Sequence, residues 1–272
     1  MKNFTQQIQD IKDQNYELDF SDTLSQAFDN FKKTSLIQGA ILFLLMIMIF
    51  MLLMGITGII MGVGLTTDFF TNLQAAQLQE SNTSIILQLI INVLATSAIA
   101  PLSAGMIKIA HNAEIQKTFG FSTAFEYYKS TYLKDLCLSM LYISLVTASI
   151  NSISKILMTG GNTGYEVFLF PILVLLNIMI PLLTFLSAPL IIFANQNATN
   201  AIKISVFLVL KKFWTILLLL FLGCVLASLG IIMLCIGLFF TIPILYSMQY
   251  IIFRNAIQID EISEIDQIGS SE

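Results

Sequence analysis

The chain has few of the residues on which enzymatic and metal chemistry depend. Its 272 residues include one histidine, His111, and three cysteines, none in a Cys-x-x-Cys pair, so it has no structural zinc signature. The sequence also lacks His-Glu-x-x-His, Gly-x-Ser-x-Gly and a phosphate-binding glycine loop. We therefore predict no catalytic, cofactor-binding or metal-binding residues and no enzymatic activity. The alternative is an intramembrane enzyme that uses His111 as a base, with Glu114 on the same helix face.

Charge is scarce as well. Only 11% of the residues are charged, against about 25% in typical soluble domains, and 56% are hydrophobic. Apolar stretches run over about 37–64, 85–110, 135–158, 166–195, 213–229 and 231–253. Each is long enough, or nearly so, to cross the bilayer core of about 30 Å as a helix. Continuous apolar runs favour helices over a barrel. We predict an all-α, polytopic membrane protein with six transmembrane helices in three hairpins.

The middles of the six stretches contain no ionisable residue. Charged groups at membrane depth mark ion paths and proton relays, so their absence argues against a proton-coupled pump or a voltage sensor. A channel or facilitator for small neutral solutes remains an alternative.

The basic residues are distributed asymmetrically about these stretches. Of the thirteen Lys and Arg residues, twelve fall on one side, and Lys155 is the exception. By the positive-inside rule, both termini and the regions 111–131 and 195–212 are expected in the cytoplasm. The first 35 residues have no apolar core of a cleavable signal peptide. No basic surface typical of nucleic-acid binding is evident.

Short amphipathic segments precede the first, third and fifth stretches. They share a Phe, two residues, a large apolar residue and a Lys, starting at Phe28, Phe125 and Phe207. We predict cytoplasmic interfacial helices whose phenylalanines pack onto the membrane or the bundle. The predicted organisation is a polar N-terminal segment (1–20), a membrane domain (21–256) and an acidic C-terminal tail (257–272). The membrane domain divides into possible units at 21–110, 121–195 and 200–256, although this short pattern could also recur by chance.

All five prolines lie in the closing helices of the expected hairpins, at Pro101, Pro171, Pro181, Pro189 and Pro243. A proline inside a helix removes a backbone hydrogen bond and bends the helix, so we expect the fourth helix to bend twice. We predict a lateral lipid groove at Pro101, Pro181, Pro189 and Pro243, with Lys108 and Lys212 contacting the headgroup. The alternative is that the prolines are packing kinks.

The first stretch also contains a GxxxG motif, Gly58 to Gly62. This motif allows two helices to approach closely. We expect it to pack within the bundle, with a dimer contact as the alternative.

Several segments carry a family resemblance. They are Pro101-Leu102-Ser103-Ala104-Gly105, Phe121-Ser122-Thr123-Ala124-Phe125, Ala201-Ile202-Lys203-Ile204-Ser205 before Lys212-Phe213-Trp214, Leu229-Gly230-Ile231, and Tyr250-Ile251-Ile252-Phe253-Arg254. Over about residues 20–256 the chain resembles uncharacterised bacterial six-span proteins related to the membrane domain of glycerophosphodiester phosphodiesterases. The phosphodiesterase activity implied for some relatives needs a separate soluble barrel, and no such domain fits here.

From these observations we expect a multi-pass protein of the bacterial inner membrane. Membrane lipids are the expected partners, together with a membrane-protein partner or a second copy of the chain. The protein would bind lipid or other hydrophobic material, or support a membrane complex.

Overall fold

The computed structural model describes residues 7–11, 16–62, 82–159, 163–233 and 236–257. Within these residues the secondary structure is entirely helical. They contain six helical stretches long and apolar enough to cross a membrane, at Phe20–Ile56, Ile86–Glu114, Leu133–Ser154, Phe168–Ala194, Phe213–Ile232 and Ile236–Ile257. The predicted helical class and the six spans are confirmed, and the chain is a multi-pass membrane protein.

The labelled elements follow one another along the chain. They are α2 (Phe20–Gly62), α4 (Asn82–Glu114), α5 (Phe121–Phe125), the 3₁₀ helix η1 (Glu126–Lys129), α6 (Leu133–Thr159), α7 (Thr163–Leu183), α8 (Ser187–Ala194), α9 (Ala198–Lys211), α10 (Phe213–Ser228), the 3₁₀ helix η2 (Leu229–Met233), α11 (Ile236–Thr241) and α12 (Pro243–Ile257). Residues 7–11 are also helical.

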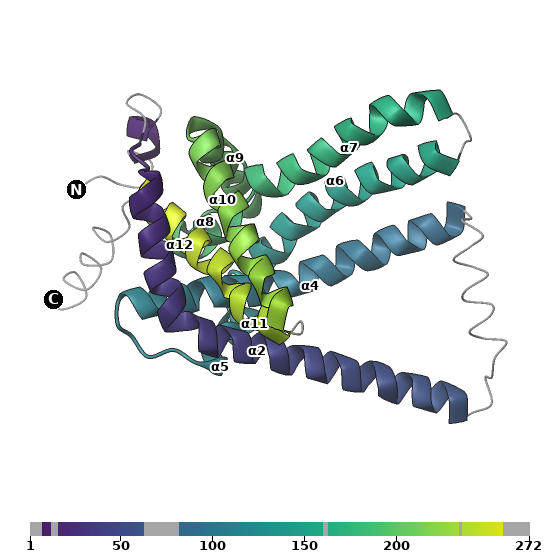
Figure 1. Cartoon of the computed structure of the whole chain (residues 1–272), viewed down its shortest axis with the longest axis horizontal. Coiled ribbons are helices and arrows are strands. Elements are labelled where there is room, and N and C mark those ends of the chain that lie inside the picture. The colour runs from purple at the N-terminus through teal and green to yellow at the C-terminus, as the bar shows by residue number, and fades with distance from the viewer. Residues whose placement is uncertain (1–6, 12–15, 63–81, 160–162, 234–235, 258–272) are drawn as a thin grey trace.

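The helix α2 joins the first predicted lead-in segment and the first span in one element of 43 residues. At 1.5 Å per residue it is about 65 Å long, roughly twice the thickness of the hydrocarbon core. Its first part runs beside α12, and its second part turns away and extends in the same general direction as α4 (Figure 1). Only a fraction of α2 can therefore lie in the bilayer.

The other two lead-in segments differ from the first. The second consists of the short α5 followed by η1, and α5 lies against α4. Gly105 makes this contact possible, because a Cβ added there would lie 2.0 Å from the Ala124 carbonyl oxygen. The third is the separate helix α9. It begins at Asn197, whose side chain accepts a hydrogen bond from the Asn200 N–H, and it ends at the non-helical Lys212.

Proline interrupts the fourth and sixth spans differently. Pro171 and Pro181 both lie inside α7, and the chain leaves the helix at residues 184–186 before α8 begins. Where the sequence predicted two bends, the structure thus has one break, between Pro181 and Pro189. In the sixth span, Pro243 is the first residue of α12, a position where its missing N–H removes no helix hydrogen bond.

Burial is concentrated at one end of the molecule. The buried core comes mainly from the end of α4 and from α8, α9 and α12, and Ile11, Tyr16 and Leu18 of the N-terminal segment belong to it. The Tyr16 hydroxyl donates to the Leu208 carbonyl oxygen at 2.9 Å. Burial raises the pKa of Tyr16, so the hydroxyl stays protonated as a donor. The segment predicted as polar therefore packs against α9.

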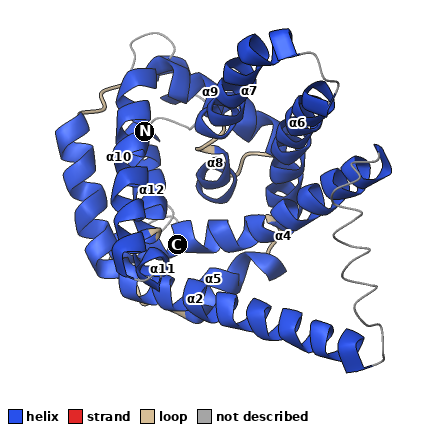
Figure 2. Ribbon diagram, turned by 45° about the vertical axis from the view of Figure 1, so that its right-hand side comes forward, coloured by secondary structure: helices blue, strands red, loops and turns tan. Residues whose placement is uncertain are grey.

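The remaining parts of α2, α4, α6 and α7 extend away from this core, and α2 diverges from α4, while α6 and α7 stay side by side (Figures 1 and 2). Only 11% of the most apolar window of the first and fourth spans is buried, against 50% in the sixth. On α2, a Cβ added at Gly55 or Gly58 would have nothing within 4 Å. The packing within the bundle that we predicted for the GxxxG motif is therefore not seen at Gly58.

Candidate functional site

The part of α2 that packs in the core, from Thr23 to Gln38, is called its inner part here. It presents a buried polar face to its neighbours. Thr23, Asn30, Thr34 and Gln38 are each 1% exposed or less, and Ala27 lies among them. Their spacings of seven, four and four residues place them on one side of the helix. The Phe28 side chain, on another side, is 41% exposed. These uncharged polar residues therefore face the protein, whereas charged residues such as Asp29 and Lys32 are exposed.

Two amides on this face bind the backbone of α4. Asn30 Nδ2 donates to the Ala110 carbonyl oxygen and Gln38 Nε2 to the Met106 carbonyl oxygen, each at 2.8 Å. Asn30 precedes Gln38 in the sequence, whereas its acceptor Ala110 follows Met106. The helices α2 and α4 therefore run antiparallel along this contact, which is called the seam below. Hydrogen bonds between membrane helices stabilise by about 0.6 kcal/mol each on average, so the stripe acts through several modest bonds.

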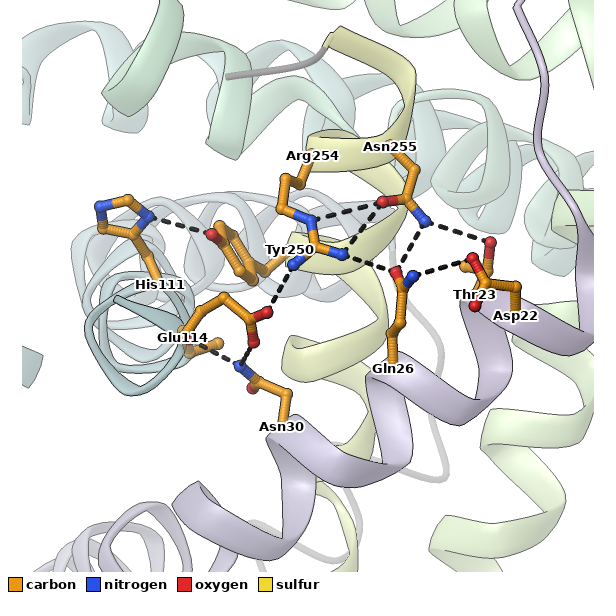
Figure 3. A network of polar contacts seen from close by, with 10 residues as sticks. Asp22, Thr23, Gln26, Asn30, His111, Glu114, Tyr250, Arg254 and Asn255 are labelled. Carbon is orange, nitrogen blue, oxygen red and sulfur yellow. Dashed lines mark hydrogen bonds and ion pairs between the residues drawn. The ribbon is translucent and has the colours of Figure 1, made fainter. Parts of the chain in front are cut away.

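Arg254 joins three helices at the end of this seam (Figure 3). From α12, its Nη1 donates to Glu114 Oε1 of α4 and its Nη2 to Gln26 Oε1 of α2, both at 2.6 Å. The side chains of Arg254 and Glu114 are 12% and 30% exposed. Asn255 extends the network by donating to Thr23 Oγ1 at 3.3 Å. The first, second and sixth spans are thereby tied together by polar contacts.

His111 lies next to this network but pairs elsewhere. Its Nδ1 is 3.1 Å from the Tyr250 hydroxyl, and its ring lies 4.8 Å from that of Phe193. Glu114, considered above as a partner of His111, instead forms the ion pair with Arg254 (Figure 3). Glu114 is therefore not the carboxylate partner of His111 that the intramembrane-enzyme alternative expected, and the imidazole pairs with a phenol hydroxyl instead. In the part of the chain that the structure describes, no three His, Cys, Asp or Glu side chains gather where they could hold a metal.

A scan against protein-family models, a search of curated proteins and a search of solved structures each found no match to this chain. The six spans and the geometry of the described residues are therefore the basis for the proposed function.

The break in the fourth span is a second organised polar feature. Pro189 has no N–H, so the Phe185 carbonyl oxygen lacks the donor that a continuous helix would provide. Gln249 Nε2 of α12 donates to that oxygen. Ser205 of α9 donates to the Leu183 carbonyl oxygen at 2.8 Å, and its hydroxyl accepts from the Leu186 N–H at 3.0 Å. Side chains of two other helices thus satisfy the main-chain groups of the break.

The residues predicted for the lipid groove occupy different surroundings. Pro101, Pro189 and Pro243 are buried, whereas Pro181 is exposed. The half-buried Lys108 holds its Nζ 5.5 Å from the centre of the Phe193 ring. Lys212 is half-buried at the junction of α9 and α10. The groove and its headgroup contacts remain predictions.

Sequence reasoning missed the network around Arg254. Arg254 and Glu114 are 140 residues apart, so their pairing has no local signal. A partial signal was present in the stripe from Thr23 to Gln38, because polar residues at spacings of seven and four indicate a helix face.

Proposed function

We propose that the protein is a non-enzymatic integral protein of the bacterial inner membrane that binds lipid or other hydrophobic material, or supports a membrane complex. One observation carries the lipid part of this proposal. The parts of α2, α4 and α7 that extend from the core expose large apolar side chains, such as Phe50, Ile91 and Phe168 at 55%, 57% and 76%. Surfaces of this kind suit acyl chains.

The composition of these surfaces supports the same proposal. Residues 44–59, 86–107 and 168–183 contain no Asp, Glu, Lys or Arg. A charged solute would find no partner there for its desolvated charge, whereas a hydrocarbon chain loses nothing by leaving water. Two residues of the predicted groove, Pro101 and Pro181, belong to these segments, and Lys108 and Lys212 are its proposed headgroup contacts.

A structure determined in lipid nanodiscs tests the groove. We expect ordered acyl density between the helices that carry Pro101, Pro181 or Pro189, and Pro243, and native mass spectrometry should detect bound phospholipid. If these helices pack tightly without such density and no lipid is retained, lipid binding is excluded and a scaffold for a membrane complex becomes the better proposal.

The buried seam supports a second candidate, a facilitator for small neutral solutes. Asn30 Oδ1 and Gln38 Oε1 are buried amide oxygens without a hydrogen-bond partner in the described structure. Buried acceptors of this kind are commonly satisfied by internal water, and a hydrated seam would admit small solutes. Stopped-flow light scattering on proteoliposomes measures water and solute flux. Flux above that of empty liposomes, reduced by Gln38→Leu, would favour the facilitator, and flux equal to that of empty liposomes would exclude it.

The proposed topology places both termini, 111–131 and 195–212 in the cytoplasm, following the distribution of lysines. With Cys137, Cys224 and Cys235 replaced by serine, single cysteines can be introduced for labelling with an impermeant thiol reagent. We expect labelling from outside at Ser81→Cys and Asn162→Cys, and none at Lys117→Cys. Outside labelling at position 117 would overturn the topology.

We also propose that the three units are internal repeats and that the family resemblance reflects relatedness. Similar side-chain pairs in the lead-in segments support the repeats. The ring centres of Phe28 and Phe31 are 5.9 Å apart at 34°, and those of Phe125 and Tyr128 are 6.0 Å apart at 33°. Phe207 shares a different feature with Phe28, since a lysine four residues later lies over each ring.

A further inference from the structure

The corner between α9 and α10 carries an exposed aromatic side chain beside basic residues. Trp214, the only tryptophan of the chain, is 73% exposed on the first turn of α10. Lys212 lies two residues before it, and Lys211 Nζ lies 5.7 Å from the centre of the Phe207 ring. Tryptophan is typical of the membrane–water interface, where its ring meets lipid and its N–H meets the headgroups.

An apolar face of α10 leads away from this corner. Trp214, Leu218, Phe221 and Val225 are 73%, 54%, 66% and 43% exposed. Their spacings of four, three and four residues place them in one stripe along the helix. The stripe starts at the basic corner and continues for about 16 Å at 1.5 Å per residue, which is about half the thickness of the hydrocarbon core. This length matches the acyl chain of a lipid in one leaflet.

The charge of this region favours an anionic lipid. Between Glu166 and Asp260 the sequence contains no Asp or Glu, whereas it contains Lys203, Lys211 and Lys212, as well as Arg254, which is paired with Glu114. The helices α9 and α10 therefore supply positive charge without any carboxylate of their own.

The lysine pair Lys32–Lys33 on α2 provides a comparison. Lys32 Nζ also lies over a phenylalanine ring, 4.8 Å from the centre of Phe28. It is, however, 2.9 Å from Asp29 Oδ1, a carboxylate of its own helix. In both pairs one lysine lies over a phenylalanine ring. The pairs differ because α2 contains the nearby acidic residue Asp29, whereas the sequences of α9 and α10 contain no acidic residue.

We propose that Lys212 and Trp214 form a binding site for an anionic phospholipid of the cytoplasmic leaflet. The phosphate headgroup contacts Lys212, and an acyl chain lies along the stripe from Trp214 to Val225. This site depends on the proposed lipid binding and on the proposed topology, and it adds a preference for headgroup charge at a named surface outside the proline groove.

The single tryptophan makes the site directly measurable. The purified full chain is reconstituted in phosphatidylcholine vesicles that contain, at equal mole fraction, phosphatidylcholine or phosphatidylglycerol with brominated acyl chains. Bromine quenches tryptophan fluorescence on contact. We expect both brominated lipids to quench Trp214, with association of the anionic lipid favoured about fivefold, because a lysine near the surface contributes about 1 kcal/mol of attraction. Higher salt should reduce the preference.

Matched variants assign the preference to the corner. Lys212→Gln should abolish most of it, Lys212→Arg should retain it, and Lys33→Gln should leave it unchanged. Equal quenching by the two brominated lipids in the unaltered protein, or an unchanged preference in Lys212→Gln, would overturn the site. Absence of quenching by either lipid would also overturn it. The proline groove is tested separately by acyl density in nanodiscs, so failure at this corner and failure of the groove are distinguishable.

Discussion

The two parts of α2 have opposite surroundings although they belong to one continuous helix. In the inner part, polar side chains such as Asn30 and Gln38 are buried and bonded to α4. In the outer part, large apolar side chains such as Met51 and Ile59 are 66% and 68% exposed. In water this exposed apolar surface would destabilise the outer part, whereas in a bilayer the apolar side chains would contact the hydrocarbon chains of lipid. The polarity of the buried face therefore distinguishes the part of α2 that packs on protein from the part that suits lipid.

The two parts of α2 are also held by different contacts. The inner part is fixed by the Arg254 ion pair, by side-chain hydrogen bonds and by close backbone approach, whereas the outer part has few protein contacts. Substitutions that disturb the fold should therefore act mainly in the inner region.

The largest effect is expected for Arg254→Met. It removes the charge partner of Glu114 and one of the two donors to Gln26 Oε1, which should destabilise the protein by about 3 kcal/mol. Thermal unfolding in detergent measures the effect. The matched control is Lys32→Met, because the Lys32–Asp29 pair is 59% and 63% exposed and should contribute less than about 0.5 kcal/mol. Equal melting of the two variants would contradict the assigned role of Arg254.

A smaller effect is expected at the break in the fourth span. Ser205→Ala removes the partner of the Leu186 N–H and of the Leu183 carbonyl oxygen, which should cost about 2 kcal/mol. Gln249→Leu should act similarly through the Phe185 carbonyl oxygen. Ser228→Ala serves as the control, since its hydroxyl bonds only the Cys224 carbonyl of its own helix in the described structure. A loss as large in Ser228→Ala would show that the break is not specifically supported.

Alanine substitutions at two glycines of α2 test the difference between its two parts. A Cβ at Gly39 would lie 2.5 Å from Phe240 Cδ1 and 3.0 Å from the Phe239 carbonyl oxygen, whereas a Cβ at Gly55 would meet nothing within 4 Å. Gly39→Ala should therefore destabilise by about 1 kcal/mol or more. Gly55→Ala should leave stability unchanged or raise it by up to about 1 kcal/mol through helix propensity. Melting curves of the two variants in one detergent give the comparison, and the same sign at both positions would refute it.

The smallest effects are expected at the phenylalanines of the lead-in segments. Phe28 and Phe125 are each 41% exposed, while Phe207 packs partly against the core. Replacing each by Asp brings a charge into an apolar contact, and Phe207→Asp should lower the melting temperature most. Unchanged melting of all three variants would remove the support that these positions give to the repeats.

The six spans were predictable because long apolar runs have a composition that soluble helices rarely show. The inner limit of the first span was harder to predict. Phe20 to Lys33 contains charged residues and was expected to form a separate helix, yet no breaker such as proline ends α2 between the two parts. Within this continuous helix, Asn30 and Gln38 bind α4 over two turns.

The polar contacts were less predictable because they join distant parts of the chain. Proline signalled an interrupted fourth span, but the main-chain groups at the break, residues 184–186, are bonded by Ser205 and Gln249 from other helices. Arg254 was expected just after the last apolar run, and it lies in the last turn of α12. Its pairing with Glu114 depends on how three helices pack, and no local pattern encodes that packing.

The contacts of Arg254 also determine when, during synthesis, the polar face of α2 can find all its partners. Asn30 and Gln38 find their acceptors on α4, which leaves the ribosome early, whereas Gln26 and Thr34 meet Arg254 and Ser247 of the last helix. Until that helix has been made, part of the polar face of α2 has no native partner. A chain released before residue 254 therefore keeps an incomplete polar seam, which is a feature that quality-control proteases of a membrane could recognise.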